Sequence, residues 1–254
     1  MEAARSEPLS FADQTLRFLE RIEHRVATTP SEREAAFRLR SEAYQKAGIL
    51  KSGAVDKLYD PLYDDHHLGW TTMTFVDGEL AGTVRVNIGF DERAVLPGLR
   101  AFADVLAPRL RARQAIAELS CLAANLPLSG AYPQLAYVIL RPAYMAAEHF
   151  GADIFLASPR AEQIAFYGRT FGAAIWREPR DYPGLATKLA CMGADFHAAR
   201  SRIEARYPFY KSTLAEREAL FGRRRDNFER FGVRNDARPH DDGLGLDMEQ
   251  SDCA

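Results

Sequence analysis

Three side chains that can do chemistry stand close together in the stretch Glu118-Leu119-Ser120-Cys121, inside an otherwise apolar run. A carboxylate can act as a general base, and a hydroxyl or a thiol can act as a nucleophile or bind a substrate. Because side chains of a strand alternate between its two faces, we expect Glu118 and Ser120 on one face and Cys121 on the other. Cys121 also has no base beside it in the sequence, so we interpret it as an inert apolar filler.

Glu118 is expected to have either an ion-pair partner or a functional role, because burying an unpaired carboxylate in an apolar strand costs free energy. Two interpretations stay open at this point. Glu118 is a general base, or it forms a salt bridge with Arg85 of a neighbouring predicted strand and has a structural role only. Arg85 in turn pairs with a carboxylate such as Glu118 or binds a ligand's carboxylate with both of its terminal nitrogens.

The elements that position these residues follow from hydrophobic periodicity and turn residues. A capping box is predicted to begin one helix at Thr29 or Ser31, with Glu34 as its acidic member. The dipeptide Asp77-Gly78 predicts a hairpin. Helices are expected over 11–22, 29–48, 135–151 and 159–173, within 91–113 with a break at Pro108, and over 194–231 with a break at Pro208. Strands are expected over 23–29, 69–76, 79–88, 115–123, 152–157, 174–178 and 184–192, with irregular chain over 49–68 and a loop over 126–134.

Length and composition restrict the class of protein. The chain has 254 residues, of which 47% are hydrophobic and 27% charged, so we expect one domain over 1–234 with its core at about 24–195. The polar tail 235–254 is expected to be disordered. No signal peptide or membrane span is recognisable, which favours the cytoplasm. A net charge of −2 argues against a general nucleic-acid binder, and three scattered cysteines predict free thiols.

The predicted order of elements is an antiparallel beginning followed by a strand-helix-strand crossover. This order indicates a mixed α/β (α+β) sheet, whose central parallel pair comes from 115–123 and 152–157. The layout resembles the GCN5-related N-acetyltransferase-like fold. The resemblance implies a central mixed sheet flanked by helices, in which the two parallel strands splay apart and an acyl thioester lies in the gap.

Five motifs restrict the resemblance to two related families. The stretch "AELSCLAAN" resembles the E-x-S-R strand of autoinducer (acyl-homoserine-lactone) synthases and of the related long-chain N-acyl amino acid synthases. The other four motifs run in the same order as in those families and cover about 24–195. They are the helix motif on Arg40 and Tyr44, the acidic turn on Tyr59 and Asp60, the G-x-x-R strand on Gly82 and Arg85, and the helix end "AFYGRTFGA".

Departures from these motifs separate the two families. Cys121 stands where the strand motif has arginine, Leu50 stands where autoinducer synthases have tryptophan, and Lys57 stands where they have the first acid of the turn. The missing groups belong to the S-adenosylmethionine and acyl-carrier pocket of the autoinducer synthases. The departures therefore favour an N-acyl amino acid synthase over a homoserine-lactone synthase.

The resemblance implies an N-acyltransferase that moves a long-chain fatty acyl group from a pantetheine thioester to the amino group of an amino acid. Glu118 is then the general base, and Arg85, Ser120, Arg40, Tyr44 and Asp60 bind the substrates. A coenzyme A-dependent small-molecule acetyltransferase and a non-catalytic member that binds an acyl group or a partner remain alternatives. No tightly bound cofactor is expected.

The expected acyl donor is an acyl carrier protein, because the segment after 124 offers only Gly130 to a coenzyme A pyrophosphate. Arg109, Arg111 and Arg113 are candidates for docking that acidic protein. The neighbouring His66 and His67 are expected to point apart at a strand edge, and no metal site is predicted. The segment "GRRRDNFERFG", which holds Arg223 to Arg225, Phe228 and Phe231, is a candidate for peripheral membrane contact.

Overall fold

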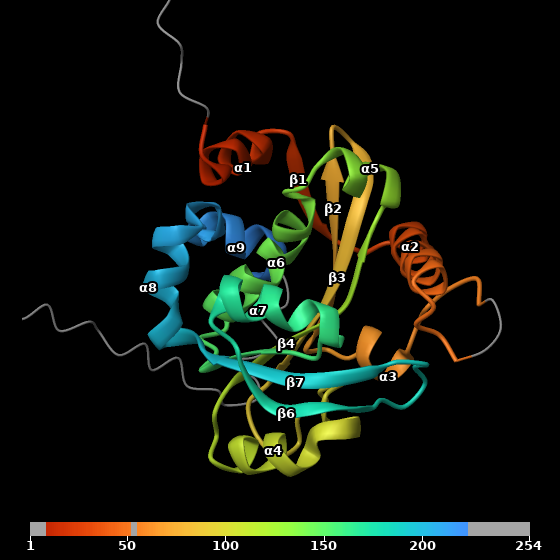
Figure 1. Ribbon diagram of the computed structural model, residues 1–254, viewed down its shortest axis with the longest axis vertical. Helices are drawn as coiled ribbons and strands as arrows, with labels where there is room; N and C mark the ends of the chain where they lie inside the picture. The colour runs from red at the N-terminus through yellow and green to blue at the C-terminus, as the bar shows by residue number, and fades with distance from the viewer. Residues whose placement is uncertain (1–8, 52–54, 223–254) are drawn as a thin grey trace, which may run out of the picture. The chain divides into compact units, whose positions relative to one another are not determined.

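A seven-stranded sheet forms the centre of the computed structural model, which describes residues 9–51 and 55–222. The strands lie in the order β1-β2-β3-β4-β5-β7-β6, and α2 and α6 lie on opposite sides of β2 to β4 (Figure 1). The strands are β1 Ile22–Val26, β2 Gly69–Val76, β3 Glu79–Gly89, β4 Ile116–Ala124, β5 Ile154–Ala157, β6 Ala174–Asp181 and β7 Lys188–Asp195. The helices are α1 Phe11–Leu19, α2 Pro30–Lys46, α3 Pro61–Asp64, α4 Leu99–Arg111, α5 Leu126–Ala131, α6 Leu135–His149, α7 Ile164–Phe171, α8 Phe196–Arg206 and α9 Leu214–Phe221, with single 3-10 turns at Ala161–Gln163 and Pro208–Tyr210.

The pairing of β4 with β5 is the one parallel pairing of the sheet within the described residues. It runs from Ile116 opposite Ile154 to Leu119 opposite Ala157 and then stops. β4 continues to Ala124 without β5 beside it. The predicted mixed sheet with a central parallel pair that splays apart is therefore confirmed.

The predicted hairpin and the helix before it are also confirmed. Asp77 and Gly78 both have positive φ, at 48° and 83°, as a two-residue turn between twisted antiparallel strands requires. The helix α2 begins after Thr29, whose side chain accepts a hydrogen bond from the backbone of Glu32. Glu32, and not the expected Glu34, completes the capping box, because Thr29 is the residue with extended backbone.

Three predictions about helices are wrong. The expected irregular chain over 49–68 contains the short helix α3, which Asp60 caps by accepting from the backbone N–H of Leu62. α4 runs through Pro108 and departs from helical φ and ψ at Phe102 instead. Proline removes one backbone donor, and the neighbouring turns of the amphipathic helix tolerate the loss because Val105, Leu106 and Leu110 are buried. The expected loop over 126–134 contains the short helix α5, which Asn125 caps by accepting from the backbone N–H of Leu128 at 3.3 Å.

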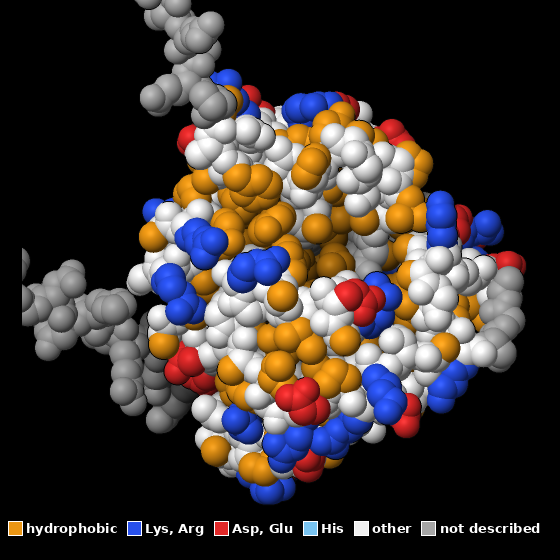
Figure 2. All heavy atoms as spheres, in the orientation of Figure 1, with side chains coloured by type: hydrophobic (Ala, Val, Ile, Leu, Met, Phe, Trp, Pro, Cys, Tyr) orange, Lys and Arg blue, Asp and Glu red, His pale blue; other side chains and the backbone are white. Residues whose placement is uncertain are grey.

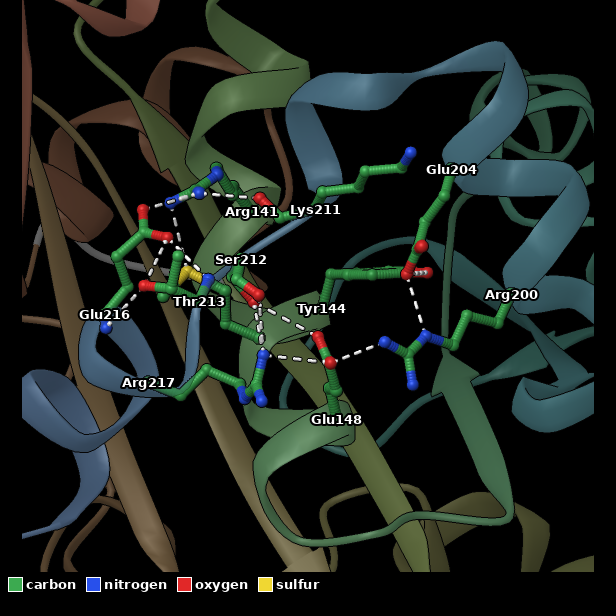
Figure 3. Close-up of polar contacts among 11 residues, drawn as sticks. Arg141, Tyr144, Glu148, Arg200, Glu204, Lys211, Ser212, Thr213, Glu216 and Arg217 are labelled. Atoms are coloured by element: carbon green, nitrogen blue, oxygen red, sulfur yellow. Dashed lines mark hydrogen bonds and ion pairs between the residues drawn. The ribbon is translucent and has the colours of Figure 1, made fainter. Parts of the chain in front are cut away.

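The C-terminal helices are held on α6 by a network of buried charges (Figure 3). The Glu148 carboxylate, with 8% of its side chain exposed, contacts the guanidinium groups of Arg200 at 2.6 Å and Arg217 at 2.9 Å. Arg141 donates to the carbonyl of Lys211 and to Glu216, at 2.8 and 2.7 Å. The predicted break at Pro208 is confirmed, since α8 ends at Arg206 and a 3-10 turn follows.

Some predictions fall on residues outside the described ones. They are the tail 235–254 and the basic segment with Arg223 to Arg225, Phe228 and Phe231. The single domain over 1–234 stays a prediction as well. Within residues 9–51 and 55–222, no helix combines the length and the apolar character that a membrane crossing needs.

The network predicts a measurable cost for removing its buried anion. Substituting Glu148→Ala leaves the largely buried Arg217 without its carboxylate and is expected to lower the free energy of unfolding by about 3 kcal/mol. Glu162→Ala is the control, because the Glu162 side chain is 59% exposed in its pair with Arg160. Urea denaturation measures both, and a Glu148→Ala variant as stable as the control would contradict the structural role.

Candidate active site

A β-bulge interrupts β4 directly after the Glu118-Leu119-Ser120 stretch. Ser120 lies opposite Arg85 of β3, and the next pair joins Ala123 to Thr83, so two residues of β4 face one of β3. Cys121 sits in this bulge with φ of 50°. The bulge ends the alternation of side chains, and the prediction that Cys121 faces away from Glu118 and Ser120 is wrong. The half-buried Cys121 lines a cavity together with both of them.

Two cavities meet at the bulge. Cavity A, of about 250 Å³, is lined by Glu118, Arg85 and several tyrosines, among them Tyr63 and Tyr182. Cavity B, of about 370 Å³, follows β4 past the end of β5 and is lined mainly by small or apolar side chains of α2, β4 and α7. Figure 2 shows a hollow floored by apolar side chains between α5 and α7. The residues shared by both cavities are Tyr44, Leu119, Ser120, Cys121, Ser158, Leu185 and Leu189.

Glu118 is completely buried and only half satisfied. Its Oε2 accepts a hydrogen bond from the backbone N–H of Gly98 at 3.0 Å, and its Oε1 has no hydrogen-bond partner among the described residues. Burial raises the pKa of Glu118 to about 7, against the opposing effects of the Gly98 N–H and the charge of Arg85. A carboxyl group with this pKa exchanges protons near neutral pH, as a general base must.

The predicted salt bridge between Glu118 and Arg85 is wrong, because Asp64 is the ion-pair partner of Arg85. Its Oδ2 accepts from Arg85 Nη1 at 3.1 Å, and its Oδ1 accepts from Arg40 Nη1 at 2.7 Å. Burial alone would raise the pKa of Asp64, but the two guanidinium groups and the backbone N–H of Asp60 hold it below its usual range. Asp64 therefore carries a buried negative charge between two buried positive ones.

Sequence reasoning missed Asp64 and Ser158. Asp64 lies one helical turn after Asp60, at the end of α3, and no local pattern in the sequence shows that it meets Arg85. Ser158 follows β5 directly, and its buried Oγ has no hydrogen-bond partner among the described residues. Because Ser158 lines both cavities, its free hydroxyl is available to a ligand at their junction.

Of the other predicted binding residues, three line a cavity and Arg40 does not. Ser120 lines both cavities and accepts a hydrogen bond from Arg85 Nε at 3.0 Å. Tyr44 also lines both cavities. Asp60 lies on the wall of cavity A and pairs with Arg100 at 3.2 Å. Arg40 is fully buried, lines neither cavity, and bonds to Asp64 and Thr71.

The two histidines are not at a strand edge and do not point apart. His66 and His67 lie in the bend and turn between α3 and β2, with ring centroids 4.3 Å apart. A turn removes the alternation that an extended strand would impose. Within the described residues, no three His, Cys, Asp or Glu side chains gather in a way that suits a metal ion.

The three arginines predicted to dock a carrier protein lie on or just after α4, against β6 (Figure 1). Arg109 is half-buried, with its guanidinium carbon 3.8 Å from the ring centroid of Trp176. Arg111 and Arg113 are exposed. None of the three lines cavity A or cavity B.

Comparisons with known proteins agree with this geometry. The solved structure of FeeM, an N-acyl amino acid synthase from uncultured soil microbes, is similar with a TM-score of 0.62 and 20% identity, over 74% of this chain and 98% of that chain. The autoinducer synthase LasI is similar with a TM-score of 0.52 and 14% identity, over 70% and 93%. MesI, described as a CoA-dependent acyl-homoserine lactone synthase, gives 0.50 and 16%, over 75% and 97%. These likenesses confirm the acetyltransferase-like fold.

A search of curated protein sequences gives no match. A comparison with models of protein families, in contrast, matches residues 35–195 to the family described as N-acyl amino acid synthase FeeM. The matched range is more than half of the chain and contains the residues of α2 and β4 that line the two cavities. The chain therefore belongs to the FeeM family of N-acyl amino acid synthases.

Proposed function

We propose that this protein transfers a fatty acyl group from the pantetheine thioester of an acyl carrier protein to the amino group of an amino acid, with Glu118 as the general base. The position of Glu118 carries the proposal. Its unbonded Oε1 belongs to a carboxyl group that lines cavity A, two residues before the bulge where cavity A meets cavity B. The two substrates enter from the two cavities and react at the bulge.

Cavity B suits the donor. On its β5 side, β4 has no strand beside it after Leu119 among the described residues, so the amide groups of a pantetheine arm can take the place of the missing strand. Small side chains such as Ala123 and Ala124 line this gap. Cys121 and Leu122 lie outside the paired register of β3, and a backbone N–H of the bulge is the candidate to polarise the thioester carbonyl.

Cavity A suits an acceptor that carries a carboxylate. Arg40 and Arg85 bring two positive charges to the buried cluster and Asp64 brings one negative charge, which leaves an excess of one positive charge. Arg85 lines cavity A, so it is the group that binds the carboxylate. Arg40 acts through Asp64 as a positioning residue.

The reaction then follows from these positions. Glu118 removes a proton from the acceptor ammonium, and the free amine attacks the thioester carbonyl to form the C–N bond. The C–S bond breaks, the nitrogen of the new amide gives up its second proton, and this proton goes to the departing thiolate. Tyr44 and Tyr167 both line cavity B, and burial raises the pKa of each hydroxyl, so both stay protonated at neutral pH and can donate a hydrogen bond to the departing sulfur.

The chain beside cavity B supports a carrier protein over coenzyme A. A pyrophosphate is usually bound by free backbone N–H groups at the start of a long helix. α5 has only six residues, and the Asn125 side chain already accepts from its first turn. Arg160, a cation on the wall of cavity B, is paired with Glu162.

Turnover with different donors tests the proposal. We expect N-acyl amino acid by mass spectrometry from fatty acyl carrier protein, and at least tenfold less from the matching acyl-coenzyme A. Glu118→Gln should lower kcat at least 100-fold and remove the inflection near pH 7 from the profile of kcat/KM. An unchanged rate in Glu118→Gln would refute the base, and preference for acyl-coenzyme A would refute the donor.

The stability of Glu118→Gln gives an independent check that folding is intact. The pKa of Glu118 is raised from 4.5 to about 7 in the folded state, so the folded protein holds this proton more tightly than the unfolded chain. Stability of the wild type therefore falls as pH rises from 4.5 through 7. Relative to wild type, the variant should gain up to roughly 3 kcal/mol over that range by urea denaturation. A difference that does not change with pH contradicts a raised pKa.

The acceptor site is tested with Arg85→Lys, which keeps the charge beside Asp64 but loses the planar pair of donors. We expect KM for the amino acid to rise about tenfold, with KM for the acyl donor unchanged. The amino acid methyl ester is the control, because it has no carboxylate to bind. If Arg85→Lys weakens the ester as much as the free acid, Arg85 does not bind the carboxylate.

A further inference from the structure

Three exposed arginines on neighbouring helices have no carboxylate partner among the described residues. They are Arg169 of α7 and Arg202 and Arg206 of α8, which together are called the α7–α8 patch. Within residues 9–51 and 55–222, none of the three forms an ion pair. Some arginines elsewhere are paired, as Arg21 is with Asp77 and Arg177 with Asp104, whereas the exposed Arg111 and Arg113 form no ion pair among the described residues. The patch is therefore a concentration of positive charge that the described residues do not neutralise.

The three guanidinium groups belong to one surface. Arg202 packs across the end of α7, where a side-chain carbon at Gly172 would collide with its guanidinium. Arg206 lies over the ring of Tyr207, 5.3 Å from the centroid, and this ring contacts that of Tyr137. Burial raises the pKa of the Tyr137 hydroxyl, and the nearby charges of Arg169 and Arg206 oppose the rise. Both arginines therefore lie near the same hydroxyl.

The α7–α8 patch flanks cavity B. Gln163 and Tyr167, at the start and on the inner side of α7, line that cavity, and Figure 2 shows basic side chains over α7 and α8 beside the hollow. The arginines of α4 lie elsewhere, against β6. A protein that delivers its prosthetic arm into cavity B must rest beside the mouth of this cavity, where the patch is.

The helix α8, which carries two arginines of the patch, is fixed to α6 by polar contacts. α8 is tied to α6 by the ion pair of Arg200 with Glu148 and by the hydrogen bond of the Tyr144 hydroxyl to Glu204, which Arg200 also contacts within α8 (Figure 3). Arg200 is paired with Glu148 and Glu204. Arg202 and Arg206 on the same helix are exposed to solvent. The helix therefore holds one arginine for structure and presents two outward.

We propose that the α7–α8 patch is the docking surface for the acidic face of the acyl carrier protein, a partner that rests on the function proposed above. Unpaired surface cations attract an acidic protein over long range and orient it, which raises the association rate. An anionic membrane is the less favoured partner. Among the described residues, α7 and α8 expose no large apolar side chain that would enter a lipid surface.

Charge reversal tests the docking surface. Arg169→Glu/Arg202→Glu/Arg206→Glu should raise KM for acyl carrier protein at least tenfold at low salt and leave kcat near the wild-type value. Activity with the same acyl group on free pantetheine should be unchanged. Because Arg202 packs on Gly172, Arg169→Glu/Arg206→Glu serves as a second variant that leaves this contact intact. Arg111→Glu/Arg113→Glu on α4 is the matched control and should behave as wild type.

Each outcome decides the proposal. A selective loss with acyl carrier protein, together with a KM that rises with salt in the wild type but not in the variant, supports it. An unchanged KM in both patch variants, an equal loss with acyl-pantetheine, or a loss only in the α4 control overturns it. Patch-dependent binding to phosphatidylglycerol vesicles with an unchanged KM also overturns it. If the wild type acylates no amino acid from either donor, the proposed function has failed instead, whatever the patch does.

Discussion

The parting of β4 from β5 is the constraint on which the candidate site depends. Parallel pairing ends at Leu119 and Ala157, and the bulge at Cys121 bends β4 away directly afterwards. A sheet without this break would close the gap that cavity B occupies. It would also return Cys121 to the opposite face from Glu118. The shape of the site thus depends on the end of the β4–β5 pairing and on the bulge at Cys121 and Leu122.

The charges around this break support one another. Asp64 makes it possible to bury both Arg40 and Arg85, because a buried guanidinium without a carboxylate would cost several kcal/mol. With Arg85 bound to Asp64, Glu118 is left without an ion-pair partner, and burial then raises its pKa to about 7. An ion pair between Glu118 and Arg85, one of the two interpretations that the sequence leaves open, would have lowered this pKa and made Glu118 a weaker base. The proposed role of Glu118 therefore depends on Asp64, which pairs with Arg85 instead of Glu118.

What the sequence predicts well is local or periodic. The hairpin at Asp77-Gly78, the order of strands and the central parallel pair follow from turn residues and from alternation. The bulge breaks alternation without a sequence signal, so the side of Cys121 was predicted wrongly. Asp64 meets Arg85 only through tertiary packing. A run of basic residues in the sequence likewise does not predict where positive charge gathers on the surface. Arg109, Arg111 and Arg113 are close in sequence but line neither cavity. Arg169, Arg202 and Arg206 are up to 37 positions apart and lie on the neighbouring helices α7 and α8.

The bulge also gives the cysteine of the strand motif a physical meaning. An arginine at position 121 would project into the junction of the two cavities, beside Arg85 and Ser120. It would fill the space in which the thioester carbonyl must meet the amine, and it would add a second uncompensated positive charge to the cluster around Asp64. Cysteine leaves this junction open and keeps the excess at one charge. The substitution at Cys121 therefore leaves Arg85 accessible to the single carboxylate of the acceptor that we propose.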